Sequence, residues 1–262
     1  MAYELIRAEK KNHLSTLTLN RPEAMNAISP LVSAELSTAF NDFNDDPDAW
    51  VCIVTGAGDR AFSAGNDLKY QALHGGEAVS RETSKLKGGF GGITFRFDCF
   101  KPIIAAVNGF ALGGGFEVAL ACDIIIAADH ATFGFPEPRV GMIAGAMGVH
   151  RLPRQIPFHL AMGMLLSSKR ISAEEAQRYG LVNEVVPMPE LIPTAEKWAA
   201  EIMMGAPLAI QASKEAALKG LAHPLDNVPR LFPLQESMYA SEDFIEGPKA
   251  FSEKRPPKWK GR

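Results

Sequence analysis

Short segments near the start of the chain carry the hydrophobic pattern of β-strands. Residues 14–19 (LSTLTL) intersperse leucines with hydroxyl residues, a pattern typical of a half-buried strand. Residues 3–8 are expected to form its partner strand, joined to it through Lys11 and Asn12. Residues 30–44 instead space their apolar side chains as a helix does. Ser29 and Pro30 predict its start, and Asp46 followed by Pro47 predicts its end.

Three compact apolar runs follow, at residues 51–54, 103–107 and 124–128. Runs of this length are typical of strands that are buried on both faces. Helical segments separate them, and strands connected in this way pair in parallel beneath covering helices. The first part of the chain is therefore predicted to have an α/β fold.

Residues 71–98 have a different composition, with glycines at 75–76 and 88–92 and charged residues between 77 and 87. One interpretation is a helical lid with mobile ends, and the other is a simple surface insertion. The pattern does not distinguish between them.

From residue 155 onward the pattern is almost wholly helical. A capping box at Ser172–Glu175 predicts a helix over residues 172–179. Further helices are expected over residues 190–203, 207–220, 225–239 and 242–253. No fixed-period sequence repeat is present.

Composition and charge narrow the class of protein. The chain has 262 residues, 47% of them hydrophobic and 22% charged, which are values typical of a globular protein. The net charge of −3 argues against a nucleic-acid binder. The longest apolar run, residues 118–128, contains Asp123 and is too short to cross a membrane. The first residues lack the pattern of a signal peptide, so a cytoplasmic location is expected.

Cysteine and histidine usage predicts neither disulfides nor a metal site. The three cysteines form no Cys-x-x-Cys pair, and an odd number suits a reducing compartment. The six histidines show no spacing typical of metal ligands. They are His13, His74, His130, His150, His159 and His223.

Two glycine-containing turns follow the buried strands. The first is residues 61–68 (AFSAGNDL), and the second is residues 108–117 (NGFALGGGFE). Three successive glycines let a backbone approach a ligand closely, and the free N–H groups of a following helix favour negative charge. The alternative interpretation is tight packing of a helix on a sheet. These turns match neither of the two glycine-rich motifs that bind nucleotide phosphates, Gly-x-x-x-x-Gly-Lys-Ser/Thr and Gly-x-Gly-x-x-Gly.

Two glutamates accompany the second turn. Glu117 falls in the first turn of an apolar helix, and Glu137 lies between Pro136 and Pro138 in a stiff loop. The apolar residues Met142, Ile143 and Met147 follow this loop. Two carboxyl groups that share an apolar pocket have raised and separated pKa values, so one can act as an acid and the other as a base.

Four motifs in order resemble the enoyl-CoA hydratase/isomerase (crotonase) superfamily. They are residues 21–27 (RPEAMNA), 61–68, 101–117 and 251–255 (FSEKR), and the resemblance covers nearly the whole chain. It implies a crotonase-like spiral of ββα units over residues 1–195, carrying an acyl-CoA site. It also implies a C-terminal helical region over residues 196–262 that builds a homotrimer or a dimer of trimers.

The resemblance also implies residue roles in a hydro-lyase of fatty acid metabolism. The backbone N–H groups of Asn66 and Gly114 would bind the thioester oxygen and stabilise the oxyanion. Glu117 would hold and deprotonate the water, and Glu137 would deliver the proton to Cα, with reversed roles in dehydration. No separate cofactor is implied, because coenzyme A enters as part of the acyl-CoA substrate.

Coenzyme A contacts are implied on the same grounds, at Ala24, Met25, Ala27, Ala64, Asp67 and Leu68. Phe251 and Lys254 correspond to positions that reach the coenzyme A of a neighbouring subunit. Lys254 also begins a basic tail, whose charges either contact phosphate or are simply solvated. This tail comprises Lys254, Arg255, Lys258, Lys260 and Arg262.

Within the superfamily, residues 135–142 (FPEPRVGM) and 150–154 (HRLPR) resemble the branch that includes carnitinyl-CoA dehydratase. Pro138 and Met147 depart from the usual hydratase loop, so the acyl preference stays open. Retention of both glutamates favours hydration or dehydration, because the family's isomerases, dehalogenases and decarboxylases usually lack one of them. The alternative is an isomerase or a hydratase-lyase of the family that acts on another acyl-CoA.

Two rival interpretations remain. Residues 61–65 (AFSAG) approach the Gly-x-Ser-x-Gly motif of serine hydrolases, with Ser63 as the nucleophile. A triad would then need His150 or His130 and an acid such as Asp123. Some relatives in the superfamily bind RNA and are not catalytic, but this chain shows no stripe of basic and aromatic residues.

Overall fold

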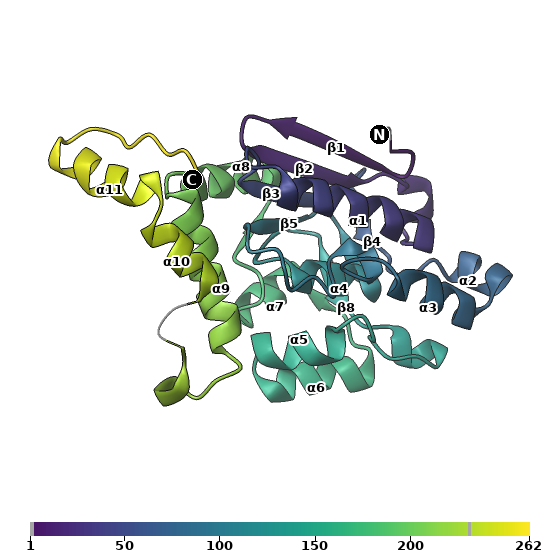
Figure 1. The fold of residues 1–262 in the computed structure, drawn as a ribbon. Coiled ribbons are helices and arrows are strands. Elements are labelled where there is room, and N and C mark those ends of the chain that lie inside the picture. The colour runs from purple at the N-terminus through teal and green to yellow at the C-terminus, as the bar shows by residue number, and fades with distance from the viewer. Residues whose placement is uncertain (1–2, 230–231) are drawn as a thin grey trace.

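The computed structural model describes residues 3–229 and 232–262. Within them, two sheets are built from alternate strands of the chain, and helices cover them (Figure 1). The larger sheet has the strand order β1–β2–β3–β5–β7–β10, and the smaller has the order β4–β6–β8–β9. Only the β1–β2 pair is antiparallel in the larger sheet.

The first strands and helix follow the hydrophobic pattern closely. Strand β1 (Ile6–Lys11) pairs with β2 (Leu14–Leu19), and α1 (Pro30–Asp45) follows. The expected partner strand at residues 3–8 is wrong by three residues, because the pairing register begins at Ile6 opposite Leu19. Ser29 caps α1 as predicted, since its side chain accepts a hydrogen bond from the Val32 N–H.

A repeated ββα unit explains the two sheets. Strands β3 (Val51–Gly56), β5 (Ile103–Val107) and β7 (Ile124–Ala128) lie in the larger sheet. Each is followed by a short strand of the smaller sheet, β4 (Ala61–Ser63), β6 (Phe110–Leu112) or β8 (Thr132–Gly134). Helices then follow in each unit, with α4 (Gly114–Ala121) directly after β6. The turn between each short strand and its following helical segment therefore recurs at one end of the smaller sheet.

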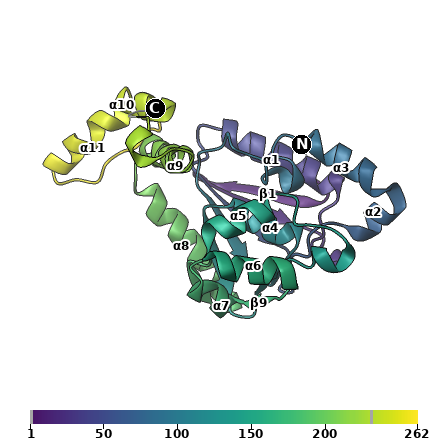
Figure 2. The same cartoon turned by 90° about the horizontal axis from the view of Figure 1, so that it is seen from below.

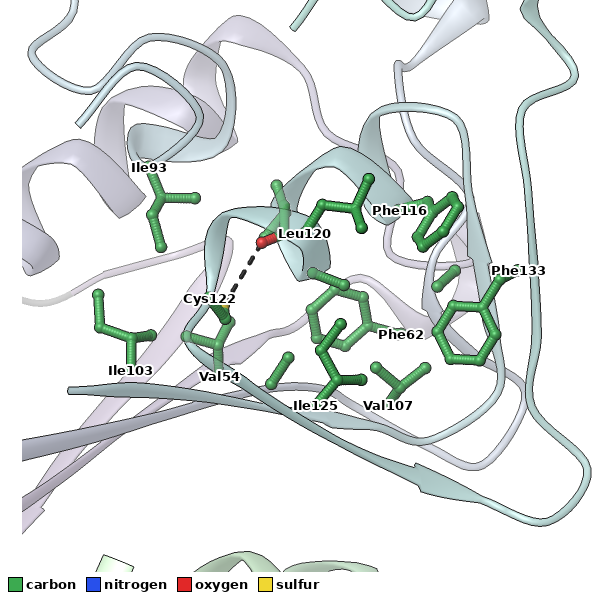
Figure 3. Packing of buried hydrophobic residues seen from close by; sticks show 14 of the residues in the cluster. Val54, Phe62, Ile93, Ile103, Val107, Phe116, Leu120, Cys122, Ile125 and Phe133 are labelled. Carbon is green, nitrogen blue, oxygen red and sulfur yellow. Dashed lines mark hydrogen bonds between the residues drawn. The ribbon is translucent and has the colours of Figure 1, made fainter. Parts of the chain in front are cut away.

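The interior between these layers is filled mainly by apolar side chains. Figure 3 shows Phe62, Phe116 and Phe133 gathered there, with Val107 and Ile125 from the larger sheet. The rings of Phe116 and Phe133 lie 5.4 Å apart between centroids in a tilted arrangement. Aromatic groups packed in this way stabilise the core and fix α4 against the smaller sheet.

Residues 71–98 form a helical segment at the edge of the fold. It consists of α2 (Leu68–His74), α3 (Gly76–Ser84) and the 3₁₀ turn η2 (Phe90–Gly92). Arg96 organises the loop that follows, because its buried guanidinium donates to the carbonyl of Gly92 and to Asn41 Oδ1. The segment is thus helical, as one interpretation expected.

The second half of the chain contains more than helices. Short strands β9 (Ile171–Ser172) and β10 (Glu184–Val186) extend the two sheets, which the helical pattern after residue 155 did not predict. Two or three residues are too few for a periodicity to be recognised. The remaining elements here are the 3₁₀ turn η3 (Glu137–Val140) and helices α5 (Gly148–Gln155), α6 (Phe158–Ser167) and α7 (Ala173–Arg178). The predicted capping box at the start of α7 is present.

The last helices leave the body of the molecule. After the 3₁₀ turn η4 (Met188–Glu190), α8 (Leu191–Met203) packs on strands β3, β5 and β7. The expected division after residue 195 falls inside this helix. Helices α9 (Pro207–Gly220), α10 (Pro233–Tyr239) and α11 (Glu242–Ser252) project outward as an arm (Figures 1 and 2).

One predicted helix of this arm is wrong. Residues 225–239 contain the 3₁₀ turn η5 (Leu225–Asn227) and then α10, and residues 230–231 lie outside the described part. Pro229 and Pro233 account for the interruption, because proline removes a backbone donor and clashes with the preceding turn. The arm is anchored to the body by Lys214, whose Nζ lies 2.7 Å from Asp123 Oδ2.

Candidate active site

A large pocket opens between the helical segment at residues 68–95 and the loop that precedes α5. Its volume is about 660 Å³. Glu117, Glu137, Asn66 and Gly114 all line it, although they come from three separate parts of the chain, with Gly114 and Glu117 both on α4. The remaining lining residues are Gln71, Gly76, Val79, Ser80, Thr83, Ser84, Leu86, Gly89, Phe90, Phe95, Met142, Ile143, Gly145 and Ala146.

The two glycine-containing turns meet at the base of this pocket. Gly65 has a φ of +87°, and a Cβ added there would lie 2.6 Å from the Leu112 carbonyl oxygen and 2.8 Å from the Gly114 nitrogen. Both distances are shorter than van der Waals contact, so only glycine allows this approach. The turn after β4 therefore rests directly on the first residue of α4.

This contact places two free amides in one pocket. Gly114 is the first residue of α4, so its N–H has no partner within the helix. Among the described residues, neither the Gly114 N–H nor the Asn66 N–H donates a backbone hydrogen bond in a turn or loop. Two unpaired donors that face one pocket, one of them at the start of a helix, can bind an oxygen atom that carries negative charge.

Ser63, in contrast, is unavailable for nucleophilic chemistry. Its side chain is fully buried, and its Oγ donates to the Asn26 carbonyl oxygen at 2.8 Å while accepting from the Gly65 N–H at 3.0 Å. The interpretation as a serine hydrolase is therefore wrong. Ser63 holds the turn in shape.

Glu117 is the more deeply buried of the two acids, with 3% of its surface exposed. Its Oε1 accepts a hydrogen bond of 2.7 Å from the Gly148 N–H, at the start of α5. Burial raises the pKa of Glu117 to about 8, the hydrogen bond from Gly148 opposes that rise, and the charge of Glu137 adds to it. This carboxyl group therefore exchanges protons close to neutral pH.

Glu137 begins the 3₁₀ turn η3 and is held by the flanking prolines. Burial raises the pKa of this carboxyl group as well. Its Oε2 is buried and has no hydrogen-bond partner among the described residues. A buried polar atom without a hydrogen-bond partner costs free energy. A group that enters the pocket can supply the missing hydrogen bond to this oxygen.

Supporting residues that the sequence analysis did not assign surround the first turn. The Arg21 Nη1 atom lies 2.8 Å from Asp67 Oδ2 and also donates to the Ala27 carbonyl oxygen. Asn26, fully buried, donates through Nδ2 to the carbonyl oxygens of Ala57 and Ala61. The RPEAMNA motif marked this segment, but nothing in its pattern indicated which partners these side chains would find.

Asp67 caps helix α2 through a 3.0 Å hydrogen bond from the Tyr70 N–H. Partial burial opposes its ionisation, but that bond and the Arg21 guanidinium together hold the pKa of Asp67 below its usual range. Its side chain is thus committed to structure. Asn66, the residue before Asp67, donates from its side chain to Gln71 Oε1 on α2.

The residues expected to contact coenzyme A fall into two groups. Ala24, Met25, Ala27, Ala64, Asp67 and Leu68 cluster around the first turn, where the Ala64 N–H donates to the Met25 carbonyl oxygen. Phe251, 88% exposed, and Lys254 lie at the end of α11 on the arm, and neither lines the pocket of this chain. Figure 1 shows α11 and the pocket helices α2 and α3 at opposite ends of the molecule.

The basic tail is largely neutralised by acids of α11. Arg255 Nη1 lies 2.5 Å from Glu246 Oε1, and Lys260 and Arg262 both contact Glu242. The hydrogen bond from Arg255 is the main reason that the pKa of Glu246 falls to about 2. These charges stabilise the end of the arm and leave less net positive charge than the sequence indicated.

The described residues contain neither a cluster of candidate metal ligands nor a helix suited to span a membrane. No group of three or more histidine, cysteine or acidic side chains there could hold a metal ion. None of the helices in this part of the chain is long and apolar enough to span a bilayer.

Comparison with known proteins identifies the family. The sequence matches the family described as enoyl-CoA hydratase/isomerase over residues 9–262. The chain belongs to the enoyl-CoA hydratase/isomerase family. It is therefore an enzyme of this type with the crotonase fold, and the predicted family and fold class are confirmed.

Relatives of this family member are similar over nearly their full lengths. A carnitinyl-CoA dehydratase of Salmonella arizonae is 44% identical over 266 residues, covering 98% of this chain and 99% of the relative. The Escherichia coli K12 carnitinyl-CoA dehydratase is 44% identical over 264 residues, covering 99% of both chains.

Solved structures of the family agree in fold. An enoyl-CoA hydratase of Mycobacterium marinum superposes with a TM-score of 0.90 at 37% identity, covering 98% of this chain and 99% of that one. An enoyl-CoA hydratase of Bacillus anthracis gives a TM-score of 0.90 at 36% identity, covering 99% and 100%. The whole chain therefore shares the family's architecture.

Proposed function

We propose that this enzyme adds water to, or removes it from, the Cα=Cβ bond of a 2-enoyl-CoA thioester. The observation that carries the proposal is the meeting of two buried carboxyl groups and two free amides in one pocket. The names of the relatives, hydratase and dehydratase, support the same reaction class. Coenzyme A would enter as part of the substrate, without a separate cofactor.

The oxyanion would form between the two turns. When a nucleophile adds at Cβ, electron density moves through Cα to the thioester oxygen, which becomes enolate-like. The N–H groups of Asn66 and Gly114 would donate to that oxygen. Each such donor typically accounts for about 10²–10³ in rate, because it is already oriented before charge develops.

The two glutamates would then divide the proton transfers. In hydration, ionised Glu117 takes a proton from water as the hydroxide oxygen bonds to Cβ, and protonated Glu137 gives its proton to Cα. The product is a 3-hydroxyacyl thioester, and the proton gained by Glu117 balances the one lost by Glu137. Dehydration follows the reverse path. A pKa of about 8 for Glu117 suits a base that works near neutral pH.

Coenzyme A itself would lie along the first turn. Backbone groups near Ala24, Met25 and Ala27 and around Ala64 are close together there, which supports a binding surface for the nucleotide and pantetheine. Asp67 would act through its structural bonds. Phe251 and Lys254 would contribute to a neighbouring subunit's coenzyme A rather than to this chain's own pocket.

A homotrimer or dimer of trimers is part of this proposal. The projecting arm exposes large apolar side chains, which a second and third copy of the chain would cover. They are Leu218, Leu221, Leu225, Tyr239, Phe244, Ile245 and Phe251. We also place the enzyme in the cytoplasm, because Cys52, Cys99 and Cys122 are free and buried as in reduced proteins.

The catalytic assignment is tested with Glu117→Gln and Glu137→Gln. Each is expected to lower hydration by at least about 10³-fold, while affinity for an acyl-CoA product stays within a few-fold. Turnover is followed by loss of the conjugated-thioester absorbance, and affinity by calorimetry. Glu174→Gln, on the exposed side of α7, is the matched control. Near-normal turnover in either active-site variant would remove that residue from its role.

The acyl group is determined by a substrate screen with crotonyl-, cinnamoyl-, methylglutaconyl- and crotonobetainyl-CoA. Crotonobetainyl-CoA is included because carnitinyl-CoA dehydratases are among the relatives. A 3-enoyl-CoA tests for isomerisation. Appearance of a 2-enoyl product without net hydration would replace the hydro-lyase assignment with an isomerase.

A further inference from the structure

Helix α5 begins at the carboxylate of Glu117. Gly148, its first residue, donates the 2.7 Å hydrogen bond to Glu117 Oε1. Arg151 follows three residues later, so it lies on the same face of α5 one turn further along. The helix thus presents both a backbone donor and a cationic side chain on the side that faces Glu117.

The guanidinium of Arg151 is held in place without a carboxylate partner. Its Nη1 donates to the Thr94 carbonyl oxygen at 2.7 Å, and the group lies over the ring of Phe97, 5.7 Å from the centroid. None of the ion pairs within 4.0 Å in the described part of the chain includes Arg151. Its charge is therefore not neutralised by a direct partner.

The charges that act on Glu117 are few. The elements packed against α4 are α5, β4, β6 and η2, and the last three contain no titratable residue. On α5, the charge that acts on Glu117 is that of Arg151, because His150 and Arg154 are exposed. On η3, Glu137 contributes a charge of the same sign as that of Glu117. Cys122, just beyond α4, influences Arg151. Arg151 lowers the pKa of Glu117, against the effects of burial and Glu137.

We infer that Arg151 is a positioning residue for Glu117: its bond to Thr94 seats α5, and with it the Gly148 donor, against that carboxylate, and its cation lies on the same face of the helix as this donor. The inference rests on the proposed role of Glu117 as the base. Arg151 does not line the pocket, so it acts through Glu117 and not on the substrate. It also connects the base to the loop around Phe95, which forms part of the pocket wall.

The test uses Arg151→Gln and Arg151→Lys, with Arg154→Gln on the same helix as the control. Glutamine can still donate to the Thr94 carbonyl oxygen but carries no charge, whereas lysine keeps the charge. We expect R151Q to raise the pH at which kcat reaches half its maximum by about one unit, which is a tenfold loss on the acidic limb. The loss should disappear on the alkaline plateau. R151K and R154Q should keep the original profile.

A second measurement separates this inference from the proposed function. Infrared difference titration reads the Glu117 carboxyl directly, assigned by its absence in Glu117→Gln, and it needs no turnover. An upward shift in R151Q supports the inference even if Glu117 proves dispensable for hydration. An unchanged Glu117 titration in folded R151Q, or an equal loss of kcat at every pH, would overturn it. If R151Q does not fold, a shifted Glu117 titration in R151K would overturn it as well.

Discussion

The carboxylate of Glu137 occupies the space that a side chain on Gly113 would fill. A Cβ added at Gly113 would lie 2.7 Å from Glu137 Oε1, and the φ of this glycine is +54°. The first of the three successive glycines in the second turn thus makes room for an acid that arrives from a different part of the chain. Its role is to admit Glu137 to the start of α4.

Gly113→Ala is therefore expected to displace Glu137 and to lower kcat by about 10²-fold or more, as loss of a positioned acid does. The effect is measured as the rate of hydration of a 2-enoyl-CoA, followed by the loss of the conjugated-thioester absorbance. Gly180→Ala is the control, because Gly180 also has a positive φ, +78°, but nothing lies within 4 Å of its added Cβ. Equal losses of activity in both variants would attribute the effect to backbone strain alone.

Gly65→Ala is expected to separate the two turns. Its added methyl would meet the Leu112 carbonyl oxygen at 2.6 Å and the Gly114 nitrogen at 2.8 Å, so the Asn66 and Gly114 amides could no longer converge. We expect kcat to fall by about 10²–10³-fold. Polarisation of a bound cinnamoyl thioester, seen as a red shift of its absorbance, should also be lost. Retention of that red shift would contradict the assigned oxyanion site.

Glu117→Gln is expected to stabilise the folded protein at neutral and alkaline pH. The pKa of this carboxyl rises from 4.5 to about 8 on folding, mainly through burial. Between these values the unfolded chain releases the proton while the folded one retains it, so stability falls as pH rises. Glutamine removes this loss, and the difference should grow to a few kcal/mol by about pH 8.

Urea unfolding from pH 4 to pH 9 measures this effect. The two proteins should have similar stability near pH 4 and should diverge as pH rises, with no further divergence above about pH 9. Glu174→Gln, at an exposed position, controls for the substitution itself. A stability difference that does not depend on pH would contradict the raised pKa of Glu117.

Ile245→Asp is expected to dissociate the assembly. Ile245 lies on α11 and is 71% exposed in the single chain, so the substitution should cost the monomer little. Burying an unpaired carboxylate in an interface costs several kcal/mol, which shifts a trimer toward monomers at micromolar concentration. Sedimentation velocity measures the change, and Ser252→Asp at the exposed end of α11 is the control. A monomeric unaltered protein would contradict the proposed assembly.

Much of the fold could be predicted because its signals are local. The buried strands at Ile103–Val107 and Ile124–Ala128 and the helix at Pro207–Gly220 have the expected bounds, since their apolar patterns are clear. Strands β9 and β10 were missed because pairing with existing sheets, and not their own pattern, makes them strands.

The residues of the candidate site also fall into those that a local pattern predicts and those that it does not. Glu117 and Glu137 could be singled out because each stands in an unusual local context, one in an apolar helix and the other between prolines. The partners that hold the site in place could not be singled out from the sequence. Arg21 and Asp67 are separated by 46 residues, and Arg151 and Thr94 by 57, so no local pattern relates them.

Local pattern along the chain was sufficient for the α/β class, the two glycine turns and the choice of two acids. These depend on backbone freedom and hydrophobic period, which neighbouring residues set. Three features were decided only by the folded chain. Both acids are buried in one pocket, Ser63 is buried and unavailable as a nucleophile, and Arg151 lies on the side of α5 that faces Glu117. Burial and charge–charge distance depend on segments far apart in sequence, and packing of the ββα units brings those segments together.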